Sequence, residues 1–212
     1  MSLSSTRFSF RLLFVLFSAL TIIGCSSTGY KKAEGTASKI TQTRTELTNA
    51  RRQIDTTLDS LTSLINADST NADALFKQFS KNITAIETQA TKVRKTADSM
   101  NAQGAAYFAA WEQDSALFQN PDLKAQADER RLELENDYAQ INAYMKATGE
   151  AYQPFDKDLR DVERFLSNDL TPAGRASISA PLERITIEGR VTQETIDNAI
   201  RVMDQVAAKF QL

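Results

Sequence analysis

Residues 72–118 read ADALFKQFSKNITAIETQATKVRKTADSMNAQGAAYFAAWEQDSALF. Apolar or small side chains recur in this stretch at alternating steps of four and three, and the series is Ala72, Phe76, Phe79, Ile83, Ile86, Ala90, Val93, Ala97, Met100, Gly104, Tyr107, Trp111 and Phe118. This spacing places one apolar stripe on a helix and is typical of long helices that pack as in a coiled coil. No alternation typical of a strand competes with it. The stretch is therefore predicted to form one long helix, which Asn120 and Pro121 end.

The same spacing continues through most of the remaining chain, in residues 33–65, 123–166 and 178–210. Short polar or Pro-containing segments separate these stretches from one another. We expect the last helix to begin at Thr171 and Pro172, because Thr is a good N-cap and Pro suits the first helical position.

Two further prolines fall inside predicted helices. Pro154 is expected to kink the third helix without ending it, because the apolar spacing continues across it. Pro181 is expected to bend the first turns of the last helix.

Four helices of about 36 to 47 residues with short connections must run antiparallel to their neighbours. The sequence therefore predicts an all-α protein, a long antiparallel coiled coil or up-down-up-down four-helix bundle, over residues 30–212. Counting back from each turn sets Gly104 opposite Tyr138 and Gly189 opposite Tyr152. Interdigitating helices require such pairs of small and large residues.

The start of the chain is organised like a secretory signal peptide over residues 1–24. It has a basic beginning, an apolar run over residues 12–23 and a small residue before Cys25. The segment Ile22-Ile23-Gly24-Cys25 resembles the bacterial lipobox, in which the Cys is diacylated on sulfur and becomes the mature N-terminus. Cys25 is the one Cys of the chain. We therefore predict removal of residues 1–24 and lipidation of Cys25, with palmitate as a marker.

The predicted anchor leaves a lipidated Cys and a short tether, residues 25–29, before the bundle. Four extended residues span at most about 14 Å, so the bundle is expected to lie close to a membrane. Ser26, in place of an Asp, favours the periplasmic face of the outer membrane by resemblance to lipoprotein sorting rules. The predicted partners are the membrane, through the lipid anchor, and an envelope protein.

The composition argues against most chemistry. The chain has no His, and its 25 basic residues nearly balance 27 acidic ones. Since His is the commonest general base and zinc ligand, its absence argues against both kinds of site. The chain also lacks the excess of basic residues that is typical of proteins that bind nucleic acid. Glu129, Glu133 and Asp137 share one helical stripe, but Arg130 and Arg131 adjoin it, so a salt-bridged surface is favoured over a metal site. We predict no enzyme, catalytic residue, metal, cofactor or nucleic-acid partner.

Two pairs of residues are candidates for contacts with a membrane or a partner. Arg44 and Arg51 occupy seam positions, where they either fix the register of the helices or await carboxylates from a partner. Phe118 and Leu123 flank the second turn, which is predicted to project past the start of the first helix, toward the membrane. They either touch lipid or cap the core of this hairpin.

Three segments resemble one family of bacterial coiled-coil proteins. They are residues 107–112 (YFAAWE), residues 152–155 (YQPF), and residues 159–166 followed by Asp169-Leu170-Thr171. The family is catalogued as domain of unknown function twenty-nine fifty-nine, and the resemblance extends from Tyr30 to about Phe210. Its members are expected to carry a Lys-His-Asn type segment where this chain has Ser167-Asn168-Asp169. The resemblance implies a helical envelope lipoprotein and no particular activity.

Two functions remain in competition. The first is a non-enzymatic, lipid-anchored, periplasm-facing scaffold or interaction module of the bacterial cell envelope. The alternative is a chaperone-like or carrier bundle that binds apolar ligands or unfolded clients. A continuously filled seam favours the scaffold, whereas a pocket inside the bundle favours the carrier.

Overall fold

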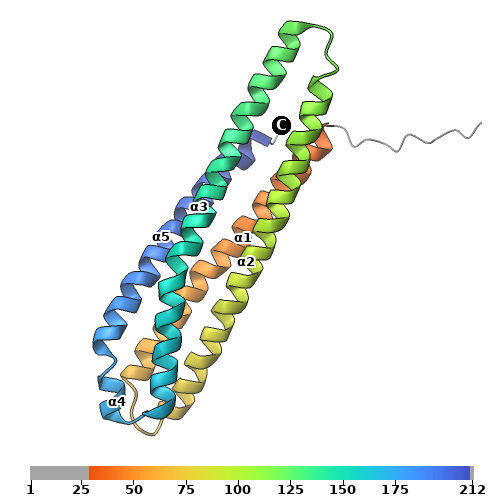
Figure 1. Cartoon of the computed structure of the whole chain (residues 1–212). Coiled ribbons are helices and arrows are strands. Elements are labelled where there is room, and N and C mark those ends of the chain that lie inside the picture. Colours follow the sequence, from red (N-terminus) through yellow and green to blue (C-terminus); the bar gives the residue numbers. More distant parts are fainter. Residues whose placement is uncertain (1–28, 211–212) are drawn as a thin grey trace, which may run out of the picture.

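The computed structural model describes residues 29–210, and these residues form an all-α bundle (Figure 1). Its helices are α1 (Gly29–Ile65), α2 (Ala72–Ser115), α3 (Pro121–Asn168), α4 (Pro172–Ala176) and α5 (Ser179–Phe210). The four long helices alternate in direction, and each packs against two others in the cyclic order α1, α2, α3, α5. The predicted all-α, up-down-up-down bundle is confirmed.

A continuous core fills the centre of this bundle. Its wholly buried side chains come from all four long helices, and the largest are Phe79, Phe155, Ile40, Leu47, Ile54, Leu61, Leu64, Ile86, Met100, Ile141, Leu159 and Leu166. At one end the core becomes aromatic, where the ring of Tyr107 packs edge-on against Phe108, Trp111 and Phe210. Tyr107 and Trp111 are therefore core residues, as their seam positions suggest.

The predicted contact between Gly104 and Tyr138 is present. A Cβ atom on Gly104 would lie 2.5 Å from Cζ of Tyr138, so the two helices approach closely only because this residue is Gly. The predicted partner of Gly189 was wrong by about one helical turn. Its nearest neighbours are Leu58, Phe155 and Ile54, because the α3–α5 turn contains an extra short helix.

The start of the last helix differs from the prediction of one bent helix. The structure has a separate short helix, α4, then a break at Ser177 and Ile178 before α5 begins. Pro181 explains the break, because it has no N–H to bond the carbonyl of Ser177 and its ring would clash with that carbonyl. The predicted N-cap is confirmed, since Oγ1 of Thr171 accepts a hydrogen bond from the N–H of Gly174 at 3.1 Å. Also as predicted, α3 continues through Pro154.

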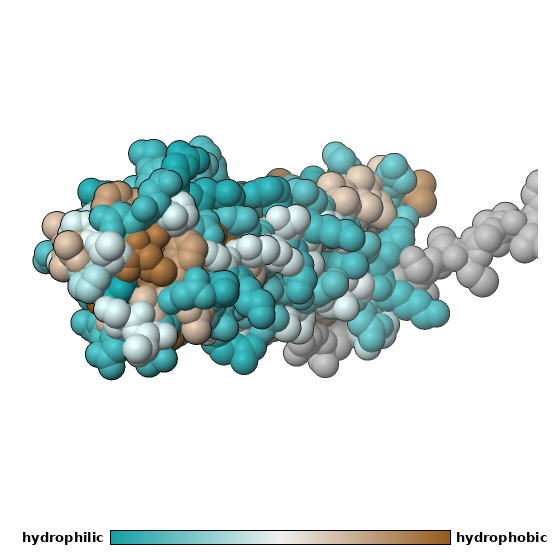
Figure 2. All heavy atoms as spheres, turned by 90° about the horizontal axis from the view of Figure 1, so that it is seen from below, coloured by the Kyte–Doolittle hydropathy of each residue, from teal (hydrophilic) through white to brown (hydrophobic). Residues whose placement is uncertain are grey.

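A buried Arg joins the two connections at the α4 end of the bundle. Arg175 is only 3% exposed, and its Nη1 and Nη2 atoms donate to the carbonyls of Leu170 (2.7 Å) and Ala67 (2.8 Å). Figure 2 looks at the molecule from this end and shows a hydrophobic patch on the near part of a mostly hydrophilic surface. The guanidinium thus ties the α1–α2 loop to the α3–α4 turn.

Candidate functional site

The α2–α3 hairpin projects beyond the other helices at the opposite end of the bundle (Figure 1). α1 begins at this level, since Gly29 lines a cleft together with Tyr107 and Trp111. α5 ends there too, where the rings of Phe210 and Tyr107 lie 5.4 Å apart. The predicted overhang is therefore present, on the side where the chain enters the bundle. Lys209, near the end of α5, pairs with Glu133 and Asp137 of α3, so α5 covers α3 at least to this level.

The tip of this hairpin exposes apolar side chains. Phe118 is 45% exposed, Leu123 is 50% exposed and Leu117 is 74% exposed. A polar contact holds the two helices together below the tip, where Oγ of Ser115 donates to a carboxylate oxygen of Asp128 at 2.8 Å. Phe118 also lines the cleft beside Gly29, which has a volume of about 420 Å³. The hairpin core covers Phe118 and Leu123 only in part, so both are available for an outside contact.

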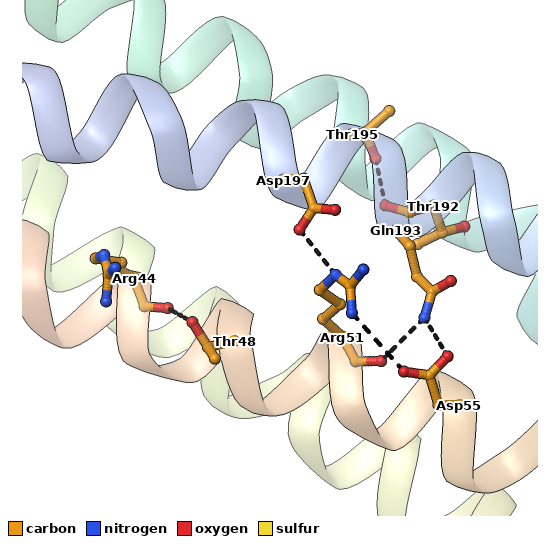
Figure 3. Close-up of polar contacts among 8 residues, drawn as sticks. All are labelled: Arg44, Thr48, Arg51, Asp55, Thr192, Gln193, Thr195 and Asp197. Carbon is orange, nitrogen blue, oxygen red and sulfur yellow. Dashed lines mark hydrogen bonds and ion pairs between the residues drawn. The ribbon is translucent and has the colours of Figure 1, made fainter.

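Arg44 and Arg51 lie between α1 and α5 and receive carboxylates from this same chain. Nε of Arg44 lies 2.5 Å from Asp204, and Nε of Arg51 lies 2.8 Å from Asp197. Figure 3 shows the guanidinium of Arg51 pointing across to α5. The step from Arg44 to Arg51 is seven residues forward along α1, and the step between their partners, from Asp204 to Asp197, is seven residues back along α5. This is the register of an antiparallel coiled coil with a heptad repeat. The acids that we thought a partner could supply are thus present in α5, which agrees with the register interpretation.

The acidic stripe on α3 forms ion pairs within the protein. Lys209 of α5 contacts Glu133 at 3.2 Å and also pairs with Asp137, while Arg130 contacts Glu133 at 2.5 Å. The hydrogen bonds from Arg130 and Lys209 hold the pKa of Glu133 below its usual value. These contacts agree with the predicted salt-bridged surface.

A second candidate site lies half-way along the bundle, where α2 and α3 separate between two points of close contact. At one point the buried hydroxyl of Tyr138 donates to the carbonyl of Met100 at 2.5 Å, beside Gly104. At the other point Arg160 of α3 contacts Glu87 of α2 at 2.8 Å. Partial burial raises the pKa of Glu87, and the charge of Arg160 acts in the opposite direction.

The cavity between these two contacts has a volume of about 560 Å³. Buried side chains of Leu47, Ile54, Ile86 and Ile196 form its floor. Small residues from α1, α2 and α3 leave the space, and they are Ala50, Ala90, Ala97 and Gly149. We call this cavity the α2–α3 groove. It was not predicted from the sequence, although the run of Ala on the α2 seam indicates it, because short side chains leave gaps between helices.

The remaining predicted site residue, Cys25, lies outside the described residues. Within residues 29–210, no helix is both long enough and apolar enough to cross a bilayer. No group of three or more Asp or Glu side chains in this described part of the chain is arranged to hold a metal ion.

The sequence profile of the family described as "Protein of unknown function (DUF2959)" matches residues 24–210, which include every helix of the bundle. The chain belongs to this family. The resemblance identified from the sequence is thereby confirmed. No curated protein and no solved structure matches the chain.

The segments that resemble DUF2959 occupy three structural positions. Tyr107 and Trp111 belong to the aromatic end of the core. Tyr152 lines the α2–α3 groove, where its hydroxyl donates to Asp156 at 2.8 Å. Asp169 and Thr171 form the turn before α4, where a carboxylate oxygen of Asp169 accepts from the N–H and Oγ1 of Thr171.

Proposed function

We propose that this protein is a non-enzymatic, lipid-anchored helical module of the bacterial cell envelope. It faces the periplasm from the outer membrane and offers its bundle to an envelope partner. The observation that carries the proposal is the placement of the exposed hairpin tip on the end where α1 begins, close to the predicted anchor at Cys25.

Two further observations support this proposal. The DUF2959 match begins at residue 24, next to Cys25, and leaves out all of the predicted signal peptide but its last residue. The Arg side chains of α1 bind acids of α5, so they favour one register of these two helices. A bundle held by a short tether with its hairpin tip at the membrane points its opposite end, at α4, away from the membrane.

Lipidation at Cys25 is tested directly with labelled palmitate in a bacterial host. The wild-type chain is expected to take up the label and to fractionate with the outer membrane. Cys25→Ser is expected to take up none and to keep residues 1–24, because the lipoprotein pathway requires the thiol. Absence of label from the wild type would falsify the anchor.

The position of the hairpin tip is tested with an environment-sensitive fluorophore on Phe118→Cys. Because lipidation occupies the only native thiol, the fluorophore attaches at residue 118 alone in the lipidated protein. On liposomes its emission is expected to shift to the blue, since the side chain enters the headgroup region. The matched control is Ser69→Cys in the exposed α1–α2 loop at the far end, where no shift is expected. Equal emission from both positions contradicts contact between tip and membrane.

A carrier of apolar ligands is a second candidate function, favoured by the α2–α3 groove. A scaffold has no use for a cavity of about 560 Å³ between two of its helices, whereas ligand pockets of small molecules commonly have this size. The two functions are compatible, because the groove lies on the shaft of the bundle and the membrane-facing tip at its end.

A further inference from the structure

We propose that the α2–α3 groove binds one single-chain amphiphile with an anionic head group, such as a long-chain carboxylate. The apolar chain lies on the floor of the groove, and the head group lies at its mouth between Arg94 and Lys146. This proposal rests on the carrier function and specifies the ligand.

The shape of the groove favours a single flexible hydrocarbon chain, bent beneath a head group that lies about half-way along the groove, over a helix or a protein segment. Its lining runs from Ile86 to Asn101 on α2 and from Asn142 to Asp156 on α3. At 1.5 Å per residue each wall is about 20 Å long. The Tyr138–Met100 and Arg160–Glu87 contacts close both ends, so nothing longer can lie in it. A peptide helix about 10 Å wide does not fit between helices that touch at both ends.

The polar side chains on the floor of the groove, Thr148, Tyr152 and Thr192, already have hydrogen-bond partners, whereas the amides of Asn101, Asn142 and Gln153 lie on its exposed rim. The single hydroxyl proton of Thr192 is shared between the carbonyls of Ala151 (3.0 Å) and Glu188 (2.8 Å). The hydroxyl of Thr148 donates to Tyr144 at 2.9 Å. Burial and the hydrogen bond to Asp156 raise the pKa of Tyr152, so this phenol stays protonated and occupied. A surface whose polar groups already have partners suits a hydrocarbon chain, because binding leaves none of them unsatisfied.

The charges at the mouth favour an anion. Arg94 lines the groove, is exposed and makes no ion pair with any described residue. Lys146 faces it from α3, and its one acidic neighbour, Glu150, is 3.6 Å away on the same exposed helix surface. Asp156, the acid within the groove, already contacts Arg160 at 3.1 Å and Tyr152. The charge left unbalanced at the mouth is therefore positive.

The test uses the protein from residue 26 onward, which keeps every described helix and needs no detergent. Palmitate and hexadecyltrimethylammonium, which share a chain length but differ in charge, are titrated by calorimetry below their micelle concentrations. The wild type is expected to bind about one palmitate per chain, at least about tenfold more tightly than the cation. Equal affinities contradict the role of the charges. Absence of heat from either probe at two well-separated temperatures, in a protein that is helical, contradicts the site, because the enthalpy of apolar burial changes with temperature.

Gly149→Phe tests the location, because a Cβ at Gly149 meets nothing within 4 Å and the ring can enter the groove. This variant is expected to fold and to lose palmitate binding, while Gly149→Ala binds within about twofold of the wild type. Arg94→Glu combined with Lys146→Glu is expected to weaken palmitate at least about tenfold. Lys81→Glu, on an exposed part of α2 outside the groove, is the charge control and is expected to change nothing.

Unchanged affinity in Gly149→Phe, or equal losses in Lys81→Glu and the Arg94 and Lys146 double variant, contradicts the proposed site. These outcomes are independent of the anchor. If Cys25 takes up labelled palmitate in cells but the groove binds none in the titration, the envelope function stands and the carrier function is contradicted. If Cys25 takes up no label but the groove binds palmitate, the anchor is contradicted and the groove site stands.

Discussion

Replacing Gly104 by Leu is expected to destabilise the protein by about 1 to 3 kcal/mol, although Leu is the better helix former. The reason is steric, since a Cβ at this position lies 2.5 Å from Cζ and 2.7 Å from the hydroxyl oxygen of Tyr138. Tyr138 is 5% exposed and is held by its bond to Met100, so it has no free space to move into. The measurement is urea unfolding followed by circular dichroism, and the melting temperature should fall by several degrees, at ~2 to 4 °C per kcal/mol.

Gly149→Leu is the matched control for this experiment. Both glycines lie inside long helices, but a Cβ at Gly149 has nothing within 4 Å. Leu at 149 is therefore expected to raise stability by up to about 1 kcal/mol through helix propensity alone. Adding Tyr138→Ala to Gly104→Leu should restore part of the loss, because it removes the obstructing ring. A melting temperature of Gly104→Leu at or above that of the wild type contradicts the observed helix packing.

The sequence predicted the helices and their order because apolar spacing and turn residues are local properties. The apolar spacing between Phe76 and Met100 is set by residues three or four apart. The helix start at Thr171 and Pro172 is likewise set by a few neighbouring residues. The contact of Gly104 with Tyr138 could also be predicted, since a short turn fixes the register near it. The same counting failed for Gly189, because Pro181 breaks the last helix and the turn before it is longer than the predicted one.

The α2–α3 groove could not be predicted, because it depends on how far apart two helices lie. Counting along the chain places Ala90 and Tyr152 on their seams, but the distance between those seams is set by the contacts at both ends. Tyr138 with Met100 and Arg160 with Glu87 fix that distance. The acids that pair with Arg44 and Arg51 were missed for a similar reason. They lie more than 140 residues away along the chain, so only the register of α1 against α5 reveals them.

No sequence pattern pointed to Arg175, yet its replacement by Met is expected to destabilise the protein by about 2 to 3 kcal/mol. Met has a similar length and keeps the apolar packing, but it leaves the carbonyls of Leu170 and Ala67 without their donors. The loss is moderated because the guanidinium no longer has to be buried, and its Nε atom has no partner in the structure. Urea unfolding measures the loss, and hydrogen exchange locates it.

The location of the effect separates this contact from a general loss of charge. Amides of the α1–α2 loop and of the α3–α4 turn are expected to exchange faster in Arg175→Met, while those at the hairpin tip keep the wild-type rate. The stability of Arg175→Lys is expected to lie between those of the wild type and Arg175→Met, because one ammonium group cannot reach both carbonyls as the planar guanidinium does. Arg190→Met, on the exposed surface of α5, is the matched control and should stay within about 0.5 kcal/mol of the wild type. If Arg190→Met and Arg175→Met unfold at the same urea concentration, the tie between the two connections contributes nothing to stability.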